Sequence, residues 1–177
     1  MKKRTNIILI VILTISIVSN AWLISRLYFT SYSNVLIIGK HMELDLSRLL
    51  NIIRNEENWQ DNPYFSQKFG SYLLNSIDTV LLLNSIADKQ PNISKTYKDS
   101  INNFYDYFNE SYHEFAIRLS KTQETISEED KIIIDKLYRK LDWAGYFLPQ
   151  GILSGRSNNL DELVAKMNKF IHAEELK

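Results

Sequence analysis

An apolar run near the N-terminus constrains this chain more than any other feature. Residues 5–29 contain the sequence NIILIVILTISIVSNAWLISRLYF, and no charged residue interrupts it before Arg26. As a helix, the roughly 21 residues that precede Arg26 would be about 32 Å long, which matches a hydrocarbon core of about 30 Å. The sequence therefore predicts a transmembrane helix, with the rest of the chain forming a domain outside the membrane.

The basic residues around this run predict its orientation. The leading sequence MKKR carries three of them, whereas only Arg26 and Lys40 follow closely. The positive-inside rule then makes the N-terminus cytoplasmic. We expect residues 1–29 to form a cytoplasmic stub and signal-anchor, and residues 30–177 to form an extracytoplasmic domain of a single-pass cell-membrane protein.

A cleaved signal peptide is the alternative interpretation of the same segment. Ser19-Asn20-Ala21 places small residues at both positions that a signal peptidase reads, after the apolar core Ile7–Val18. However, Trp22–Phe29 keeps the segment apolar beyond that site, which favours an uncleaved anchor.

Composition limits the outer domain. No acidic residue precedes Glu43, so the 21 acidic residues of the chain all lie in this domain, together with four fewer basic ones. A mildly acidic domain argues against a nucleic-acid partner. The absence of cysteine excludes disulfides and thiolate chemistry. Only five Gly and three Pro favour long helices over a turn-rich β protein, and the excess of Ile and Asn is typical of A/T-rich coding in a low-GC bacterium. Together with the predicted anchor, this indicates a bacterial envelope protein.

Apolar residues at spacings of three and four predict five helices after the anchor. We expect them at residues 35–58, 63–88, 94–121, 127–148 and 159–171. Ser127 and Asn159 stand three residues before an acidic residue, and Asp61-Asn62-Pro63 also resembles a helix start. No Pro or Gly between Thr30 and Asn34 forces a break after the anchor, so the anchor can continue directly into the first helix.

The predicted fold class is all-α, with one N-terminal transmembrane helix followed by an antiparallel four-helix bundle with a short fifth helix. Four long helices joined by short loops are typical of an up-down-up-down bundle, and we expect the fifth to pack along its outside. In outline, this architecture resembles the membrane-anchored four-helix sensor domains of bacterial receptors. The resemblance rests on no shared motif, and the chain lacks their second span and cytoplasmic signalling region.

One acidic residue indicates a possible ligand site. The helix at 63–88 has the broadest apolar face and is expected to be the most buried. Within it, Asp78 has Leu74 and Leu82 four residues to either side, so it is predicted to face the core, where a carboxylate needs a partner. Antiparallel packing would bring three residues of the neighbouring helices to the same height as Asp78: Tyr105, Tyr138 and Arg139. With Asp78 they would form either an internal hydrogen bond or ion pair, or a small pocket for a cationic ligand. A solvent-exposed Asp78 is the third alternative.

Two surface regions are candidates for contacts with other molecules. The end of the bundle far from the membrane collects a candidate partner face: Glu56, Glu57, Trp59, Asp61, Glu128, Glu129 and Asp130. Acidic helix starts are also favoured by the helix dipole alone, so solvated caps are the alternative. Phe147, Ile152 and Leu153 form an apolar loop that would lie near the membrane, touching lipid headgroups or closing the core.

No motif indicates catalysis, a metal or a cofactor. Glu110 and His113 have the Glu-x-x-His spacing of di-iron bundles, but that chemistry needs a second such pair, and no nucleophile or phosphate-loop motif is present. The sequence therefore predicts a non-enzymatic, membrane-anchored protein whose bundle binds another protein. The alternative is a sensor-like or accessory bundle with a small-ligand pocket near Asp78.

Overall fold

The computed structural model describes the chain apart from a few short segments. It covers residues 2–56, 59–62, 64–122, 124–146 and 156–173, and the side chains of residues 2–12, 28 and 61 lie outside the description. All regular secondary structure in these ranges is helical: α1 (Lys2–Asn55), a 3-10 turn η1 (Trp59–Asp61), α2 (Phe65–Lys89), α3 (Lys95–Lys121), α4 (Glu128–Ala144) and α5 (Leu160–Ile171).

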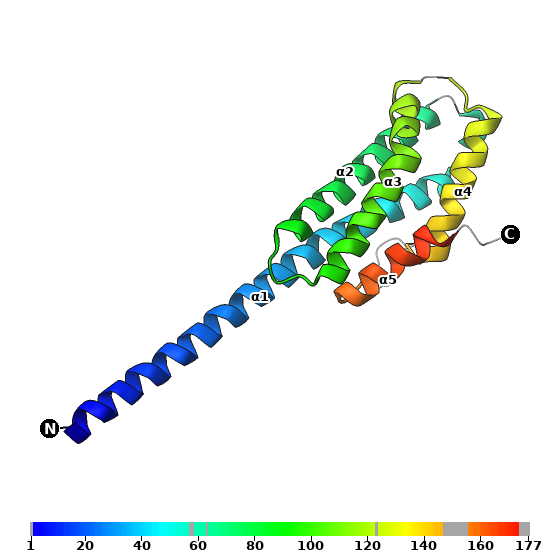
Figure 1. Cartoon of the computed structure of the whole chain (residues 1–177). Coiled ribbons are helices and arrows are strands. Elements are labelled where there is room, and N and C mark those ends of the chain that lie inside the picture. Colours follow the sequence, from blue (N-terminus) through cyan, green and yellow to red (C-terminus); the bar gives the residue numbers. More distant parts are fainter. Residues whose placement is uncertain (1, 57–58, 63, 123, 147–155, 174–177) are drawn as a thin grey trace.

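The longest helix, α1, has two parts. It contains 54 residues without a break, as the sequence between Thr30 and Asn34 allows, and it ends at Asn55. Residues 2–30 form a stem that extends from the bundle, and residues 31–55 form one wall of the bundle (Figure 1). Ser31 is the first buried residue in the described part of the chain. The length and mean hydropathy needed to cross a membrane are not found together in any helix of the described residues.

The fifth helix is part of the bundle and does not lie apart from the other four. α2 packs against α1 and α3, whereas α5 packs against α3, α4 and α1. In Figure 1, α1, α3 and α5 run in one direction, and α2 and α4 run in the other. The prediction that the fifth helix lies outside the bundle is therefore wrong. The helix buries an apolar face made of these residues: Leu160, Leu163, Val164, Met167 and Phe170.

Aromatic rings fill the part of the core where α3 meets α5. Phe104, Phe108 and Tyr112 are buried on α3 and form part of the core. The ring of Phe170 on α5 lies 5.5 Å from that of Phe104 and 5.6 Å from that of Phe108. Fully burying side chains of this size contributes roughly 1.5–3 kcal/mol each, so α5 is a main source of stability rather than an accessory.

Close backbone contact joins α2 to α3. A Cβ atom built on Gly70 would lie 2.4 Å from the backbone nitrogen of Ser120 and 2.9 Å from the carbonyl oxygen of Ala116. Glycine at this position therefore allows the two helices to approach each other backbone to backbone, which accounts for their extensive contact.

Three predicted helix starts are confirmed and two boundaries differ. The side chains of Ser94, Ser127 and Asn159 each accept a hydrogen bond from a backbone N–H three residues later. α2 begins at Phe65, and the side chain of its N-cap residue Tyr64 makes no capping hydrogen bond, whereas the predicted start at residue 63 lies outside the described residues. The fourth helix ends at Ala144 rather than residue 148, because Gly145 takes the left-handed conformation with φ of 83°.

The exposed face of α2 differs from the prediction. Leu81 and Leu82, which were expected to broaden a buried face, are 45% and 48% exposed. Asp78 is also exposed, so the prediction that it faces the core is wrong. α2 contacts helices along only two sides, and the apolar positions that exceed this contact area remain at the surface.

Hydrogen bonds define the two ends of the bundle. At the distal end, the Ser66 hydroxyl donates to the Glu124 carbonyl at 2.8 Å and joins the start of α2 to the α3–α4 connection. At the stem end, the Tyr97 hydroxyl donates to the Asp161 carboxylate at 2.5 Å, so α3 and α5 begin side by side. This arrangement confirms the predicted pairing of connections at each end.

Candidate functional site

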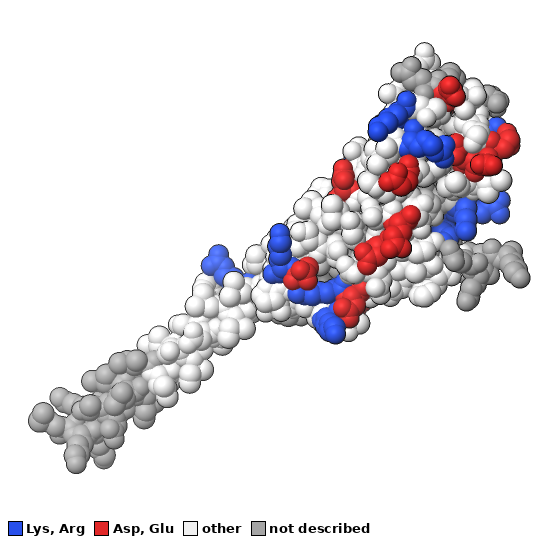
Figure 2. All heavy atoms as spheres, turned by 45° about the horizontal axis from the view of Figure 1, so that its top comes forward, with Lys and Arg blue, Asp and Glu red and all other residues white. Residues whose placement is uncertain are grey.

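The described half of the stem exposes apolar side chains on every side. Between residues 13 and 29 the large exposed apolar residues are Leu13, Ile15, Ile17, Val18, Trp22, Leu23, Ile24, Leu27 and Phe29. They include consecutive residues, so no single face of the helix carries them all. Figure 2 shows this part of the stem as an uncharged surface between the N-terminal atoms and the charged bundle. Such a surface is far larger than the scattered apolar residues that a protein normally exposes to water.

The stem changes character near the bundle. The Arg26 guanidinium lies over the ring of Trp22, with its central carbon 5.4 Å from the ring centroid. An aromatic ring paired with the first charged residue after the apolar run is typical of the boundary between hydrocarbon and headgroups.

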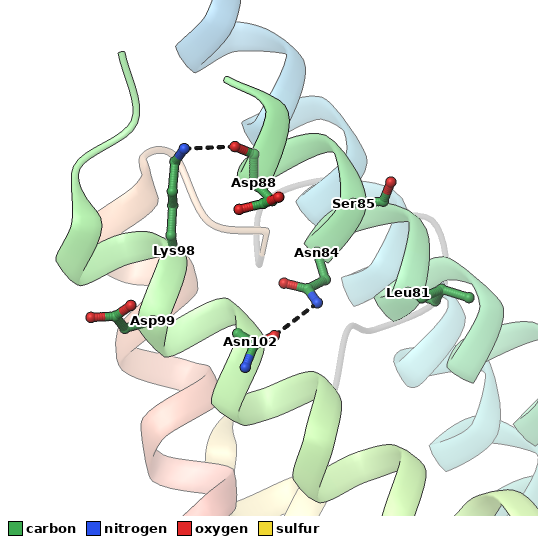
Figure 3. A pocket seen from close by; sticks show the side chains of 7 residues that line it. All are labelled: Leu81, Asn84, Ser85, Asp88, Lys98, Asp99 and Asn102. Atoms are coloured by element: carbon green, nitrogen blue, oxygen red, sulfur yellow. Dashed lines mark hydrogen bonds between the residues drawn. The ribbon is translucent and has the colours of Figure 1, made fainter. Parts of the chain in front are cut away.

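A shallow hollow lies between α2 and α3 at the stem end of the bundle. Its volume is about 430 Å³, and its lining comes from Leu81, Asn84, Ser85 and Asp88 on α2 and Lys98, Asp99 and Asn102 on α3 (Figure 3). The amide of Asn84 donates to that of Asn102 at 3.1 Å, which bridges the two helices. The sequence did not indicate this hollow, because its residues are polar and belong to two helices.

The hollow has a net negative charge, because its lining contains two aspartates and one lysine. The Lys98 ammonium group donates to the backbone carbonyl of Asp88 at 2.7 Å rather than to a carboxylate. The carboxylates of Asp88 and Asp99 are both exposed, and neither is paired within the described part of the chain. Leu81 and its exposed neighbour Leu82 add an apolar edge.

The predicted ligand residues do not form a cluster joined by polar contacts. Asp78 is exposed, and Tyr105 and Tyr138 are half-buried. Arg139 pairs with Asp135 one turn earlier on its own helix, at 2.8 Å. Among the described residues no hydrogen bond or ion pair joins any two of the four, and none of them lines the hollow.

Most of the described carboxylates at the distal end have partners within the protein. Glu56 bonds to Asn62 and Lys68, Glu128 pairs with Lys131, and Asp130 forms a two-bond ion pair with Arg118. Trp59 is half-buried, with its ring 4.9 Å from that of Phe65. Glu129 remains exposed. Glu57 and the side chain of Asp61 lie outside the described residues, as do Phe147, Ile152 and Leu153 of the predicted membrane-proximal loop.

A buried carboxylate that the sequence did not indicate holds α1 to α5. Glu43 is fully buried. Its carboxylate accepts from the backbone N–H and the hydroxyl of Ser157 at 2.8 and 2.7 Å, and from the Lys166 ammonium at 2.6 Å. Only the tertiary position of α5 supplies these donors, so α1 alone carries no signal for them.

Two further polar groups lie in this part of the core. The Tyr146 hydroxyl is buried, and it has no hydrogen-bond partner among the described residues. Burial, together with the negative charge of Glu43, raises the pKa of Tyr146 well above its usual range. Lys140 is buried and donates to the Tyr107 hydroxyl, with its ammonium 4.7 Å from the centroid of that ring. The contact with Tyr107 joins α4 to α3, and the Lys140 ammonium also lies 5.8 Å from the ring centroid of Phe170 on α5.

The histidines do not gather. His41 and His172 are exposed and His113 is half-buried, and within the described ranges no three His, Cys, Asp or Glu side chains are placed to hold a metal ion.

Comparisons with protein-family models, with curated proteins and with solved structures gave no match. The function must therefore be inferred from the geometry of the stem, of the hollow, and of the buried contacts that Glu43 makes with Ser157 and Lys166.

Proposed function

We propose that this protein is a single-pass membrane protein whose helical bundle is held outside the membrane and binds another protein. The observation that carries the proposal is the stem: one helix, continuous with the bundle, that is apolar and exposed on all sides. A bilayer is the environment that buries every side of such a helix at once.

The length and flanks of the stem support the membrane role. The uncharged run matches the thickness of a hydrocarbon core, basic residues precede it, and Trp22 with Arg26 follows. The absence of a helix able to span a membrane holds for the described residues, and the side chains of residues 2–12 lie outside them. The same charge asymmetry supports a cytoplasmic N-terminus.

The hollow and its leucine edge are the surface that we assign to the partner. Exposed Leu81 and Leu82 offer apolar area, and unpaired Asp88 and Asp99 offer negative charge beside it. A protein segment with a basic residue next to apolar ones complements this combination. The predicted distal face is less suited, because Glu56, Glu128 and Asp130 already neutralise charges of the bundle.

The membrane role is tested by alkaline extraction of the full chain from membranes. We expect the unaltered chain to remain in the pellet, and the double variant Ile15→Lys, Val18→Lys to appear in the soluble fraction. Each lysine costs roughly 2.5–3.5 kcal/mol at the centre of a spanning helix. Equal extraction of both chains at alkaline pH would refute the anchor.

The partner surface is tested by a photo-crosslinking residue at Leu82, with the same residue at exposed Lys136 on α4 as the matched control. We expect one protein to be captured from Leu82 and not from Lys136, and the charge reversals Asp88→Lys and Asp99→Lys to abolish that adduct. Adducts that are the same at both positions, or that survive charge reversal, would contradict the assignment.

A small cationic ligand is the second candidate occupant, because the hollow combines amide groups with two carboxylates. A panel of polyamines, choline and amino acids would then raise the melting temperature of the protein, and Asn102→Leu would remove the effect. No shift with the panel, combined with the crosslink above, would leave the protein partner as the occupant.

A further inference from the structure

Asn20 is a strongly polar side chain near the outer end of the apolar run in the stem. It lies between exposed apolar residues on a helix that continues through it without a break. Its side chain is exposed and makes no hydrogen bond within the described part of the chain. The following inference rests on the membrane anchor proposed above.

The depth of Asn20 leaves its carboxamide away from water. It precedes the end of the uncharged run at Ser25 by five residues, or about 7.5 Å along a helix. An asparagine side chain is too short to reach across that distance to the headgroups. Lipid chains offer neither donors nor acceptors, so the carboxamide requires a partner within the membrane.

We infer that Asn20 pairs with Asn20 of a second copy of this chain, across two parallel α1 stems. Copies inserted in the same orientation place Asn20 at the same depth, which no unrelated helix is bound to do. A carboxamide has two N–H donors and a carbonyl acceptor. Two of them related by a two-fold axis can therefore satisfy each other, as a self-complementary interface requires.

The residues around Asn20 form a seam with the right spacing. The seam is Leu13, Ser16, Asn20, Leu23 and Leu27, and all five are exposed. Alternating steps of three and four residues match the spacing of a left-handed helix pair. Within such a seam, a single polar residue fixes which residues face each other. Trp22 lies about 140° and Arg26 about 100° round the helix from the centre of this seam, where they remain in contact with lipid.

The seam continues onto the free face of the bundle. The same spacing leads from Leu27 to Thr30, Asn34, Ile37 and His41, and each of these is exposed. They lie on the side of α1 that α2, α4 and α5 leave uncovered, because the contact residues of the helix, such as Val35 and Met42, are buried. Ile37, which is 49% exposed, gives this continuation an apolar side chain.

The test is energy transfer between donor- and acceptor-labelled copies of the full chain in detergent micelles, measured over a range of protein-to-detergent ratios. We compare the unaltered chain with Asn20→Leu, Asn20→Gln and Ser19→Leu. Asn20→Leu is expected to weaken association about tenfold, the value of one interhelical hydrogen bond. Asn20→Gln keeps the carboxamide and should retain association, and Ser19→Leu, which removes a polar group outside the seam, should leave it unchanged.

Alkaline extraction of each variant from membranes separates the two hypotheses. Leucine at position 20 makes the stem more apolar, so insertion should persist. If all chains are inserted but Asn20→Leu associates as strongly as the unaltered chain, or the unaltered chain shows no association, the pairing is refuted while the anchor stands. Chains that are extracted from the membrane would refute both.

Discussion

The two parts of α1 share one helix but differ in what surrounds them. In the described part of the stem, side chains on all sides are exposed up to Thr30. From Ser31 onward, one face is buried against α2, α4 and α5, and the opposite face remains exposed. Helical hydrogen bonding is local and is the same in both parts. The distribution of apolar residues around the helix therefore distinguishes them, and it predicts a lipid environment for one part and a protein core for the other.

The bundle part of α1 also depends on polar contacts, which the described part of the stem largely lacks. Glu43 is buried among three donors, two from Ser157 and one from Lys166. Substitutions in the bundle should therefore change the free energy of unfolding, and substitutions in the stem should change membrane binding alone. The predictions below test this separation, beginning with the largest expected effect on stability.

The substitution Glu43→Ala should be the most destabilising. It removes the carboxylate that accepts hydrogen bonds from the Lys166 ammonium and the Ser157 N–H. The Lys166 side chain is only 18% exposed, so water replaces this acceptor poorly. Removing one partner of a buried pair costs about 3–5 kcal/mol. Chemical denaturation measures the loss, and Glu43→Gln, which keeps an acceptor oxygen, is expected to lose less. Equal stability of Glu43→Ala and the unaltered protein would contradict a stabilising role for the buried contacts of Glu43.

Gly70→Ala should follow, with a loss of about 1–3 kcal/mol from overpacking. The new Cβ would meet backbone atoms of α3, which cannot move without displacing the helix. Gly39→Ala is the matched control, because its Cβ would meet only the end of the Leu163 side chain. A flexible side chain can give way, and alanine favours the helix by about 1 kcal/mol, so this variant should be near neutral. Equal losses of stability in Gly70→Ala and Gly39→Ala would contradict the inference that Gly70 faces backbone atoms and Gly39 a movable side chain.

Asp130→Asn should cost about 1 kcal/mol at neutral pH. The hydrogen bonds from Arg118 are the main cause that lowers the pKa of Asp130 in the folded protein. A lowered folded pKa means that this contribution is present above the unfolded value of about 4 and is lost as pH falls below it. The difference in unfolding free energy between the unaltered protein and Asp130→Asn should therefore shrink below about pH 4.

The control for this titration is Asp135→Asn, which removes an ion pair whose side chains are 53% and 76% exposed. Exposed pairs contribute little, so its effect should lie near zero at every pH. A pH-independent difference for Asp130→Asn would show that the carboxylate charge is not what stabilises this end of the bundle.

The double variant Ile15→Lys, Val18→Lys should have the smallest effect on the bundle. Both side chains are exposed on the stem, so the free energy of unfolding in detergent should change by less than about 0.5 kcal/mol. A larger loss would mean that the stem packs against the bundle and that the two parts of α1 are not separate.

The sequence predicted the local features of the fold well. The capping residues Ser127 and Asn159 were correctly identified, because each depends on residues close together in the chain. The position of α5 was wrong. Its apolar face was correctly predicted, but amphipathicity does not say which helices receive that face.

The polar sites could be predicted only in part. Asp78 was expected to be buried because Leu74 and Leu82 flank it, yet Leu82 itself is exposed. The buried position of Glu43 was not predicted, because its three donors come from residues more than 100 positions away along the chain. Contacts of this kind depend on how helices pack, which the periodicity of one helix does not contain.

The most direct test of the two environments of α1 is a spin-label accessibility scan of the full chain in lipid bilayers. The chain has no cysteine, so single cysteines can be introduced at Ile15, Leu23, Ile37 and Arg48, all exposed on α1. Labels at positions 15 and 23 should be accessible to oxygen and protected from a water-soluble nickel complex, and labels at 37 and 48 should be accessible to the nickel complex. Equal access of the nickel complex to all four positions would contradict the account.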